Sequence, residues 1–354
     1  MALACASSKR RAFASLAENS SCRVLRLRSP SPSPMPTSMW IIALLLRLVP
    51  LLLCVAFLTL AERGVLGSMQ RRAGPEVSGV WGLLQPFWDG LKLGLAEPIL
   101  PSSASGLFLW APVLSFVISQ MIWAIIPMGT GFGVIDGVSS GLAVAGLSSV
   151  AVYGVLLAGW ASNSKYAFLG GCRSAAGMVS YELPMGAVFV TLAALTRDIT
   201  GMHSLAFSSF GVVNEVVWLA LPLWPMVIAW FVLTLAEAKR APFDLPEAEA
   251  ELVAGYNVEY SSMGFALFFL AEYASMAAMA AVTALAFMHG TGAGLGLPLA
   301  AKTVILFYPF IWVRNTLPRY RPDQFMRLGW KVFLPITLAF MVAHHTLFLS
   351  FDLA

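Results

Sequence analysis

The residues best suited to chemistry in this sequence lie together between Ala236 and Glu272. This stretch holds nine charged side chains in a chain of 354 residues that is 58% hydrophobic and only 11% charged. They are Glu237, Lys239, Arg240, Asp244, Glu247, Glu249, Glu251, Glu259 and Glu272. Crowded carboxylates repel one another, which raises the pKa of some of them toward neutrality, where they take up and release protons. The pattern favours proton chemistry, although single acids in it could instead cap helices or pair with Arg240 or with arginines of a partner.

Long apolar runs surround this stretch and predict an all-α, polytopic membrane protein. Each run has about 20 residues, the length at which a helix crosses a bilayer, and in lipid a helix satisfies its own backbone hydrogen bonds. The predicted spans, eight in number, are Met39–Ala61, Gly106–Met128, Val138–Ala161, Gly171–Thr196, Val213–Ala236, Tyr260–Met288, Leu297–Asn315 and Trp330–Ser350. Glu62 and Arg63 are expected to mark where the first span leaves the bilayer.

A surface helix is predicted between the first two spans. Its apolar side chains recur at intervals of three and four residues, beside a stripe formed by Gln85, Asp89 and Lys92. The apolar positions are Trp81, Leu84, Trp88, Leu91 and Leu95. Such a helix lies along the membrane surface, although a connector helix packed on the protein would show the same periodicity.

Residues 1–38 differ in composition from the membrane domain expected over residues 39–354. They hold six Lys and Arg residues and one acid, Glu18, together with many serines and a Ser-Pro run. This composition is typical of an organellar transit peptide. A retained, disordered extension is the alternative.

Charge is distributed unequally between the two sides of the predicted ladder of helices. The connectors after the first, third, fifth and seventh spans hold thirteen of the sixteen basic residues beyond the leader. By the positive-inside rule these connectors face the cytoplasm, or the matrix of a mitochondrion. Most of the acids share them, which indicates structured loops that form a docking surface around a polar cavity. The net charge of +4 is too small and too dispersed to indicate nucleic-acid binding.

Acids also occur inside the predicted spans. Glu182 falls near the middle of its span and Glu272 about a dozen residues into another. A charge at the centre of a bilayer costs about 3 kcal/mol on insertion scales, so an acid there is a functional candidate. With Glu237, these acids could line a wet path that leads inward from the acidic loop. Asp244 and Glu247 have capping-box spacing, which predicts a short helix after Asp244.

No metal or cofactor site is expected in this chain. The cysteines Cys5, Cys22, Cys54 and Cys172 are far apart, without the paired spacing of an iron–sulfur or zinc site. The histidines His203, His289, His344 and His345 fall near predicted helix ends, where they could not face one another around a haem. Any cofactor is therefore expected in a partner.

The sequence closely resembles subunit 1 of respiratory NADH:quinone oxidoreductase (complex I) from about Met39 to the C-terminus. The motifs that carry this resemblance occur in order and on one predicted side. They include Glu62-Arg63, Gly82-Leu83-Leu84-Gln85-Pro86-Phe87, Ser162-Asn163-Ser164-Lys165-Tyr166, Ser180-Tyr181-Glu182, Arg240-Ala241-Pro242-Phe243-Asp244-Leu245, Ala271-Glu272-Tyr273 and Leu317-Pro318-Arg319-Tyr320-Arg321. No motif alone would be specific, but together they are.

The resemblance implies a mitochondrial inner-membrane subunit with its loops on the matrix side. Its loops would pack beneath the subunit with the last iron–sulfur cluster and the large hydrogenase-derived subunit, closing a chamber for ubiquinone. NADH, FMN and the iron–sulfur clusters would be bound by partner subunits. The implied chamber and loop residues are Glu62, Arg63, Arg72, Arg240, Phe243, Asp244, Glu247, Glu249 and Glu251, with Phe265, Phe268, Phe269 and the surface helix at the quinone entrance. The implied proton relay is Glu182, Glu237, Glu259 and Glu272.

This chain departs from the family pattern in two loops. Gly64, Ala73 and Glu76 replace the usual residues after Glu62-Arg63 and around Gly74-Pro75, and Lys239 stands where the family commonly has Asn. Two other functions fit parts of the pattern. A secondary transporter could use a carboxylate relay, but such proteins often show internal repeats, and none is apparent. The equivalent subunit of a membrane-bound hydrogenase would share the fold.

Overall fold

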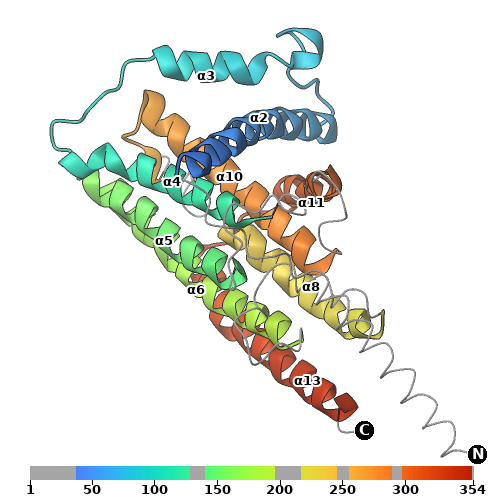
Figure 1. The fold of residues 1–354 in the computed structure, drawn as a ribbon. Coiled ribbons are helices and arrows are strands. Elements are labelled where there is room, and N and C mark those ends of the chain that lie inside the picture. Colours follow the sequence, from blue (N-terminus) through green and yellow to red (C-terminus); the bar gives the residue numbers. More distant parts are fainter. Residues whose placement is uncertain (1–36, 128–139, 196–216, 245–254, 289–296, 353–354) are drawn as a thin grey trace, which may run out of the picture. The chain divides into compact units, whose positions relative to one another are not determined.

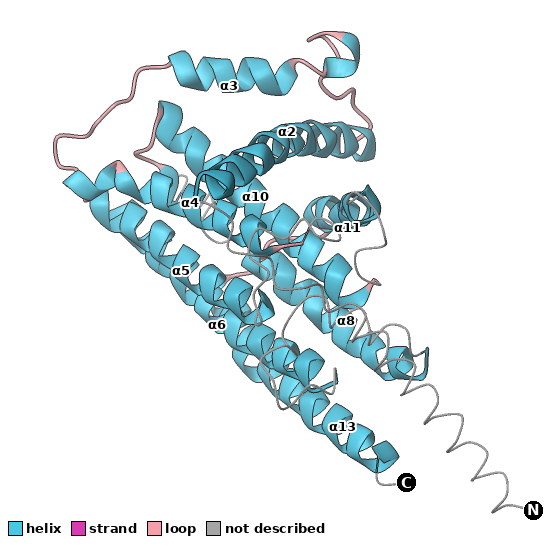
Figure 2. Ribbon diagram, viewed as in Figure 1, coloured by secondary structure: helices cyan, strands magenta, loops and turns pink. Residues whose placement is uncertain are grey.

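The computed structural model describes residues 37–127, 140–195, 217–244, 255–288 and 297–352. It divides into two compact units, Met1–Leu45 and Leu46–Ala354. The described residues form helices joined by loops and contain no strand, which confirms the all-α prediction (Figure 2). The α-helices are α2 (Thr37–Met69), α3 (Gln85–Leu95), α4 (Trp110–Ile125), α5 (Ser140–Ala161), α6 (Lys165–Leu195), α8 (Val217–Glu237), α10 (Ser262–Phe287), α11 (Leu297–Thr316), α12 (Pro322–Leu328) and α13 (Leu334–Asp352). Short turns are η1 (Val80–Gly82), η2 (Gly106–Phe108), η4 (Gly255–Asn257) and the π-helical η5 (Gly329–Phe333).

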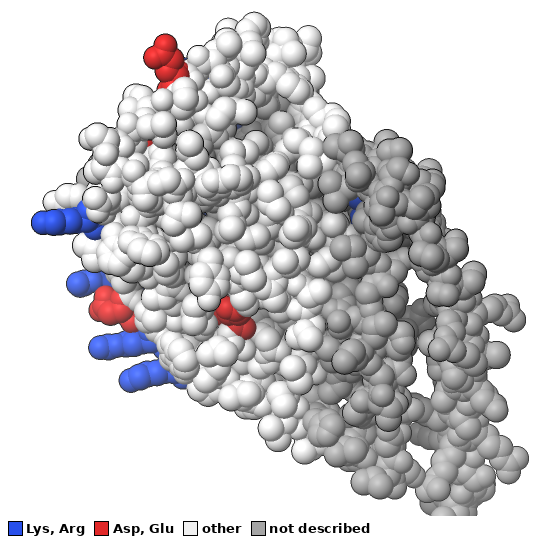
Figure 3. Space-filling model, turned by 60° about the vertical axis from the view of Figure 1, so that its left-hand side comes forward, with Lys and Arg blue, Asp and Glu red and all other residues white. Residues whose placement is uncertain are grey.

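A multi-pass membrane protein is confirmed by the length and composition of these helices. Among the described residues, six segments are long and apolar enough to cross a bilayer, namely Arg47–Met69, Gly106–Ile125, Gly141–Ala161, Lys165–Leu192, Ser262–Phe287 and Pro322–His344. The other two predicted spans correspond to α8 and α11, of 21 and 20 residues. On the face drawn in Figure 3, most of the described surface is uncharged, and Lys and Arg side chains project along one edge.

The first helix is longer than the sequence pattern predicted. The predicted span ends at Ala61, whereas α2 continues without a break to Met69. The exit from the bilayer at Glu62-Arg63 stays a prediction. The charges do not end the helix because each has a partner in another segment. Arg63 pairs with Asp89 of α3 at 2.6 Å, and Glu62 is buried against Arg240 and Arg314. A buried carboxylate that is neutralised in this way no longer requires contact with water.

Within Leu46–Ala354, the helices pack in a continuous series. α4, α5, α6 and α13 lie side by side, and α10 packs against α4, α8 and α11 (Figure 1). The C-terminal half of α10 is rich in alanine and is almost entirely buried. Its small side chains leave room for Trp230 of α8, which is fully buried and donates a hydrogen bond from Nε1 to Thr283 Oγ1 at 3.0 Å. α10 is therefore the central helix of this packing, in contact with α4, α8 and α11.

The predicted surface helix is present but begins later than its periodicity suggested. Trp81 lies in the separate turn η1 with a φ of 59°, so it does not belong to the face of α3. α3 buries none of its own residues. It is tethered by the pair of Arg63 with Asp89, and by Ser262 Oγ, which donates to the Ala96 carbonyl at 2.8 Å.

One glycine fixes the turn that leads into α3. Gly82 has a φ of +73°, and a Cβ atom there would overlap the carbonyl oxygen of Pro75. Only glycine accepts both the left-handed backbone and the close approach. By contrast, Gly90 within α3 has open space where its Cβ would stand.

We predict that Gly82→Ala loosens the segment that connects α2 to α3. The strain should cost about 1–3 kcal/mol, which would raise the population of the open, protease-sensitive segment by about 5- to 150-fold. Limited proteolysis of the assembled complex, with the cleaved peptides identified by mass spectrometry, measures this effect. Gly90→Ala is the matched control and should leave the cleavage rate unchanged or lower it, since alanine favours a helix. Equal rates for the two variants would contradict the prediction.

Candidate functional site

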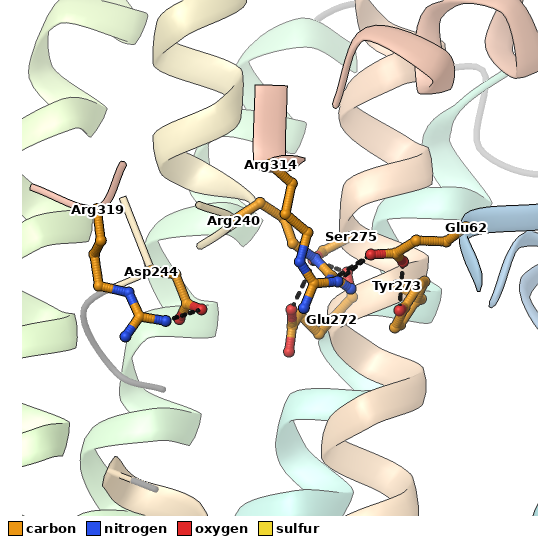
Figure 4. A network of polar contacts seen from close by, with 8 residues as sticks. All are labelled: Glu62, Arg240, Asp244, Glu272, Tyr273, Ser275, Arg314 and Arg319. Carbon is orange, nitrogen blue, oxygen red and sulfur yellow. Dashed lines mark hydrogen bonds and ion pairs between the residues drawn. The ribbon is translucent and has the colours of Figure 1, made fainter. Parts of the chain in front are cut away.

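Three buried charged residues from distant segments meet at the centre of the site. Glu62 comes from α2, Arg240 follows the end of α8, and Glu272 lies on α10 (Figure 4). Arg240 Nη1 is 3.2 Å from Glu62 Oε1, and Arg240 Nε is 3.1 Å from Glu272 Oε1. Their side chains are only 4–10% exposed. The contact of Arg240 with Glu272 is an ion pair by distance, because the Nε–H is not aligned for a hydrogen bond.

Two further residues complete this ion cluster. Arg314 Nη1, from α11, donates to Glu62 Oε1, and the Tyr273 hydroxyl donates to Glu62 Oε2. The Arg240 guanidinium lies 4.3 Å from the centroid of the Tyr273 ring. Burial lowers the pKa of Arg240, but Glu272, Tyr273 and Glu62 together raise it above its ordinary value. The guanidinium is therefore a permanent positive charge.

The loop after Arg240 is held by aromatic packing and a second ion pair. Phe243 is buried and stacks on Tyr320, with the ring centroids 5.7 Å apart, and it also contacts Phe325. Asp244 Oδ2 pairs with Arg319 Nη2 at 3.2 Å. The amide of Tyr320 donates to the Pro242 carbonyl at 3.1 Å. These contacts fix the loop against the segment between α11 and α12, which in turn fixes Arg240.

A small cavity adjoins the ion cluster; its lining is mainly apolar, and we call it the polar cavity for the acids, lysine and serines that it also contains. It has a volume of about 50 Å³ and is lined by Glu237, Lys239 and Glu272, together with apolar side chains. Four serines also line it, Ser115, Ser119, Ser148 and Ser275. Each serine hydroxyl donates to a carbonyl of its own helix, so its oxygen can still accept from water. A cavity of this size and polarity has room for about four water molecules.

The structure brings together only part of the predicted proton relay. Glu237 and Glu272 line the same cavity. Glu182 lies in the middle of α6, half-buried and outside the lining of the cavity, although its charge is within electrostatic reach of Glu237. Glu259 is half-buried between η4 and α10 and is also not part of the lining.

The predicted chamber and loop residues fall into separate groups. Arg72 is exposed and donates from Nε to Gln70 Oε1 at 2.8 Å, while Arg63 is half-exposed beside Asp89. These two arginines therefore lie outside the buried ion cluster that holds Glu62 and Arg240. Glu247, Glu249 and Glu251, and the helix predicted to start after Asp244, lie outside the described residues.

The predicted phenylalanine cluster of α10 is divided between two faces. Phe265 stacks with Phe269, which continues to Tyr273 of the ion cluster. Phe268 is buried on another face against Tyr256 and Tyr260. The three rings do not form one patch because successive side chains of a helix diverge by about 100°.

Sequence reasoning missed several residues of the site. From the sequence, Arg314 is only one of the basic residues of the connectors. Arg319 also belongs to the motif Leu317-Pro318-Arg319-Tyr320-Arg321, but no site role is predicted for it, and none is predicted for the four serines. Ser115 and Ser119 did carry a signal, because a pair of hydroxyl residues four apart on an apolar helix marks one polar face. The signal of Arg314 was its place at the end of an apolar span, close to predicted loop charges.

The chain was compared with known proteins. A family model described as NADH dehydrogenase matches residues 42–345. The chain is 54% identical over 307 residues to NADH-ubiquinone oxidoreductase chain 1 of Chlamydomonas reinhardtii, covering 86% of this chain and 98% of that relative. It is 49% identical over 316 residues to the protein of the same name from Arabidopsis thaliana, covering 86% and 95%. It is 50% identical over 307 residues to a component of NADH-quinone oxidoreductase from Rickettsia typhi, covering 82% and 88%. The chain therefore belongs to the NADH dehydrogenase subunit 1 family, the family that its motifs resemble.

Proposed function

We propose that this chain is the membrane subunit of NADH:ubiquinone oxidoreductase that forms part of the ubiquinone chamber and couples quinone reduction to proton translocation. One observation carries the proposal: the buried ion cluster and the polar cavity share Glu272, so that a polar route runs between apolar helices. The names of the relatives support the enzyme class.

Arg240 is the residue best placed to act between the two parts of this route. It contacts Glu62 on one side and Glu272 on the other. Its Nη2 atom is buried and has no hydrogen-bond acceptor within the described ranges. Since a buried donor is nearly always satisfied in a working protein, we expect water, or a quinone carbonyl oxygen that reaches the cluster, to accept from this N–H group in the assembled complex.

The coupling we propose is electrostatic. Reduction of quinone beside the ion cluster changes the local charge, and in a poorly hydrated interior that change acts strongly on neighbouring carboxylates. The protonation of Glu272 changes first, because Glu272 is paired with Arg240. Water in the cavity then carries protons between Glu272 and Glu237. Glu182 is affected through its electrostatic interaction with Glu237. The reaction thus moves protons without any redox centre in this chain.

The proposed setting is the mitochondrial inner membrane, with the loops on the matrix side. The one-sided distribution of basic residues and the composition of residues 1–38 support it. The partners are the subunit with the terminal iron–sulfur cluster and the large hydrogenase-derived subunit, which would cover the loop carrying Arg240. Ubiquinone is the substrate, and NADH, FMN and the iron–sulfur clusters belong to other subunits.

We predict that Arg240→Lys lowers quinone reductase activity by about 10-fold or more while the complex still assembles. Lysine keeps the positive charge but cannot contact Glu62 and Glu272 at once with a planar fork. Arg240→Ala should go further and destabilise the chain by about 3–5 kcal/mol, because it leaves buried carboxylates uncompensated. The measurements are quinone reduction by the purified complex and its thermal denaturation.

Arg321→Lys and Arg321→Ala are the matched controls for these variants. The Arg321 side chain is 77% exposed and lies 3.9 Å from Asp323, a pair of little energetic weight. Both controls should behave as wild type. Normal quinone reduction in an assembled Arg240→Lys complex would argue against the proposed chamber.

We further predict that Glu237→Gln and Glu272→Gln abolish or strongly reduce proton pumping in liposomes that contain the complex. Glutamine keeps the shape of the side chain and one acceptor oxygen, but it carries no charge and cannot bind or release a proton. The number of protons translocated per NADH oxidised is the measurement. Asp323→Asn, at an exposed position, is the control and should pump normally. A wild-type proton ratio in Glu237→Gln would rule out the relay.

A further inference from the structure

Lys239 occupies a backbone position that ordinarily disfavours lysine. It follows the end of α8 with a φ of 52°. The Arg240 amide donates to the Leu235 carbonyl at 3.4 Å and the Lys239 amide to the Ala236 carbonyl at 3.1 Å. This pair of bonds is the Schellman arrangement, whose left-handed residue is usually Gly or Asn. Lysine there costs about 1–2 kcal/mol of local strain.

Lys239 lines the polar cavity together with Glu237 and Glu272. Its Nζ lies 5.8 Å from the centroid of the ring of Tyr256, another lining residue, within the range of a cation–π contact. Strain at one residue persists where the surrounding structure holds it, and it often marks a functional position. The helix end therefore places Lys239 on the lining of the cavity that Glu237 and Glu272 share.

The nearby cations have different partners. Arg240 and Arg314 both contact Glu62, and Arg240 also contacts Glu272. Neither arginine lines the cavity. Lys239 is the cation found among the described residues that line it. Glu237 is 8% exposed at the end of α8, on the same cavity wall. Lys239 is thus the positive charge placed to act on Glu237.

We propose that Lys239 is a positioning cation that favours the ionised form of Glu237 and thereby sets the pH range in which the relay works. The inference rests on the proposed function, because it assigns a role within that relay. An ammonium group near a carboxylate favours the charged form of the acid. Among the described residues, the other titratable groups that face this region are Glu182 from α6, Tyr256 from η4 and Glu272 from α10.

The test uses the assembled complex in liposomes with Lys239→Asn, Lys239→Arg or the wild-type residue. Asparagine removes the charge and accepts the left-handed backbone, so the variant should fold. Without the ammonium group, Glu237 should bind its proton more tightly. The acidic limb of the pH profile of proton pumping should then move upward by on the order of one pH unit. Lys239→Arg should keep the wild-type profile.

A direct readout accompanies the pH profile. Infrared difference spectra recorded against Glu237→Gln isolate the protonated carboxyl band of Glu237, and its titration midpoint should shift in the same direction in Lys239→Asn. Lys165→Asn, which removes an exposed cation at the start of α6, is the charge-matched control and should shift neither quantity.

Each outcome separates this inference from the proposed function. An unchanged midpoint and profile in Lys239→Asn would overturn the role of Lys239, even if Glu237→Gln stops pumping. An equal shift in Lys239→Arg would also overturn it, because the effect would then come from side-chain shape and not from charge. Normal pumping in Glu237→Gln would instead remove the relay on which the inference stands.

Discussion

The structure depends on the need of buried carboxylates for a positive charge. Glu62 and Glu272 lie on apolar helices with little exposure, where an isolated carboxylate would be strongly disfavoured. Arg240 contacts both. Arg314 shares Glu62 Oε1 with Arg240, and the Tyr273 hydroxyl donates to the other oxygen, Oε2. Because removing one partner of such a pair is far more costly than never burying it, the cluster makes the arrangement of α2, α8, α10 and α11 interdependent. The pairs of Arg240 and Arg314 with Glu62 join residues 178 and 252 positions apart in the sequence.

The need to neutralise buried charge applies to the ion pairs inside the site and not to the exposed pairs at its edge. Arg63 with Asp89 and Arg321 with Asp323 are partly or largely exposed, and pairs of this kind contribute little to stability. Arg63 with Asp89 nonetheless orients α3 with respect to α2. Asp244 with Arg319 is intermediate, since its acid is buried and its base is not. Together with the packing of Phe243, it holds the loop from which Arg240 projects.

Glu272 connects this structural cluster with the polar cavity. On one side it is paired with Arg240, and on the other it shares the cavity with Glu237, Lys239 and four serines. Glu272 alone therefore separates the ion cluster from a volume that has room for water. The end of α8 contributes to both sides, because the left-handed turn at Lys239 directs adjacent residues, Lys239 and Arg240, to the cavity and to the cluster. The fold thus places two cations of different roles on one turn.

The sequence by itself determined that the chain is a helical membrane protein, which stretch concentrates its charged residues, and which family it resembles. Periodicity and composition suffice for these, because crossing lipid requires long apolar helices and makes each acid inside them conspicuous. It also indicated Arg240, Glu237 and Glu272. Only the tertiary structure decided that Glu62 turns inward from a helix continuing to Met69, that Arg314 is its partner, and that Phe268 faces away from Phe265. Those facts depend on helix rotation and on contacts between segments far apart in the sequence, and no local pattern encodes either one.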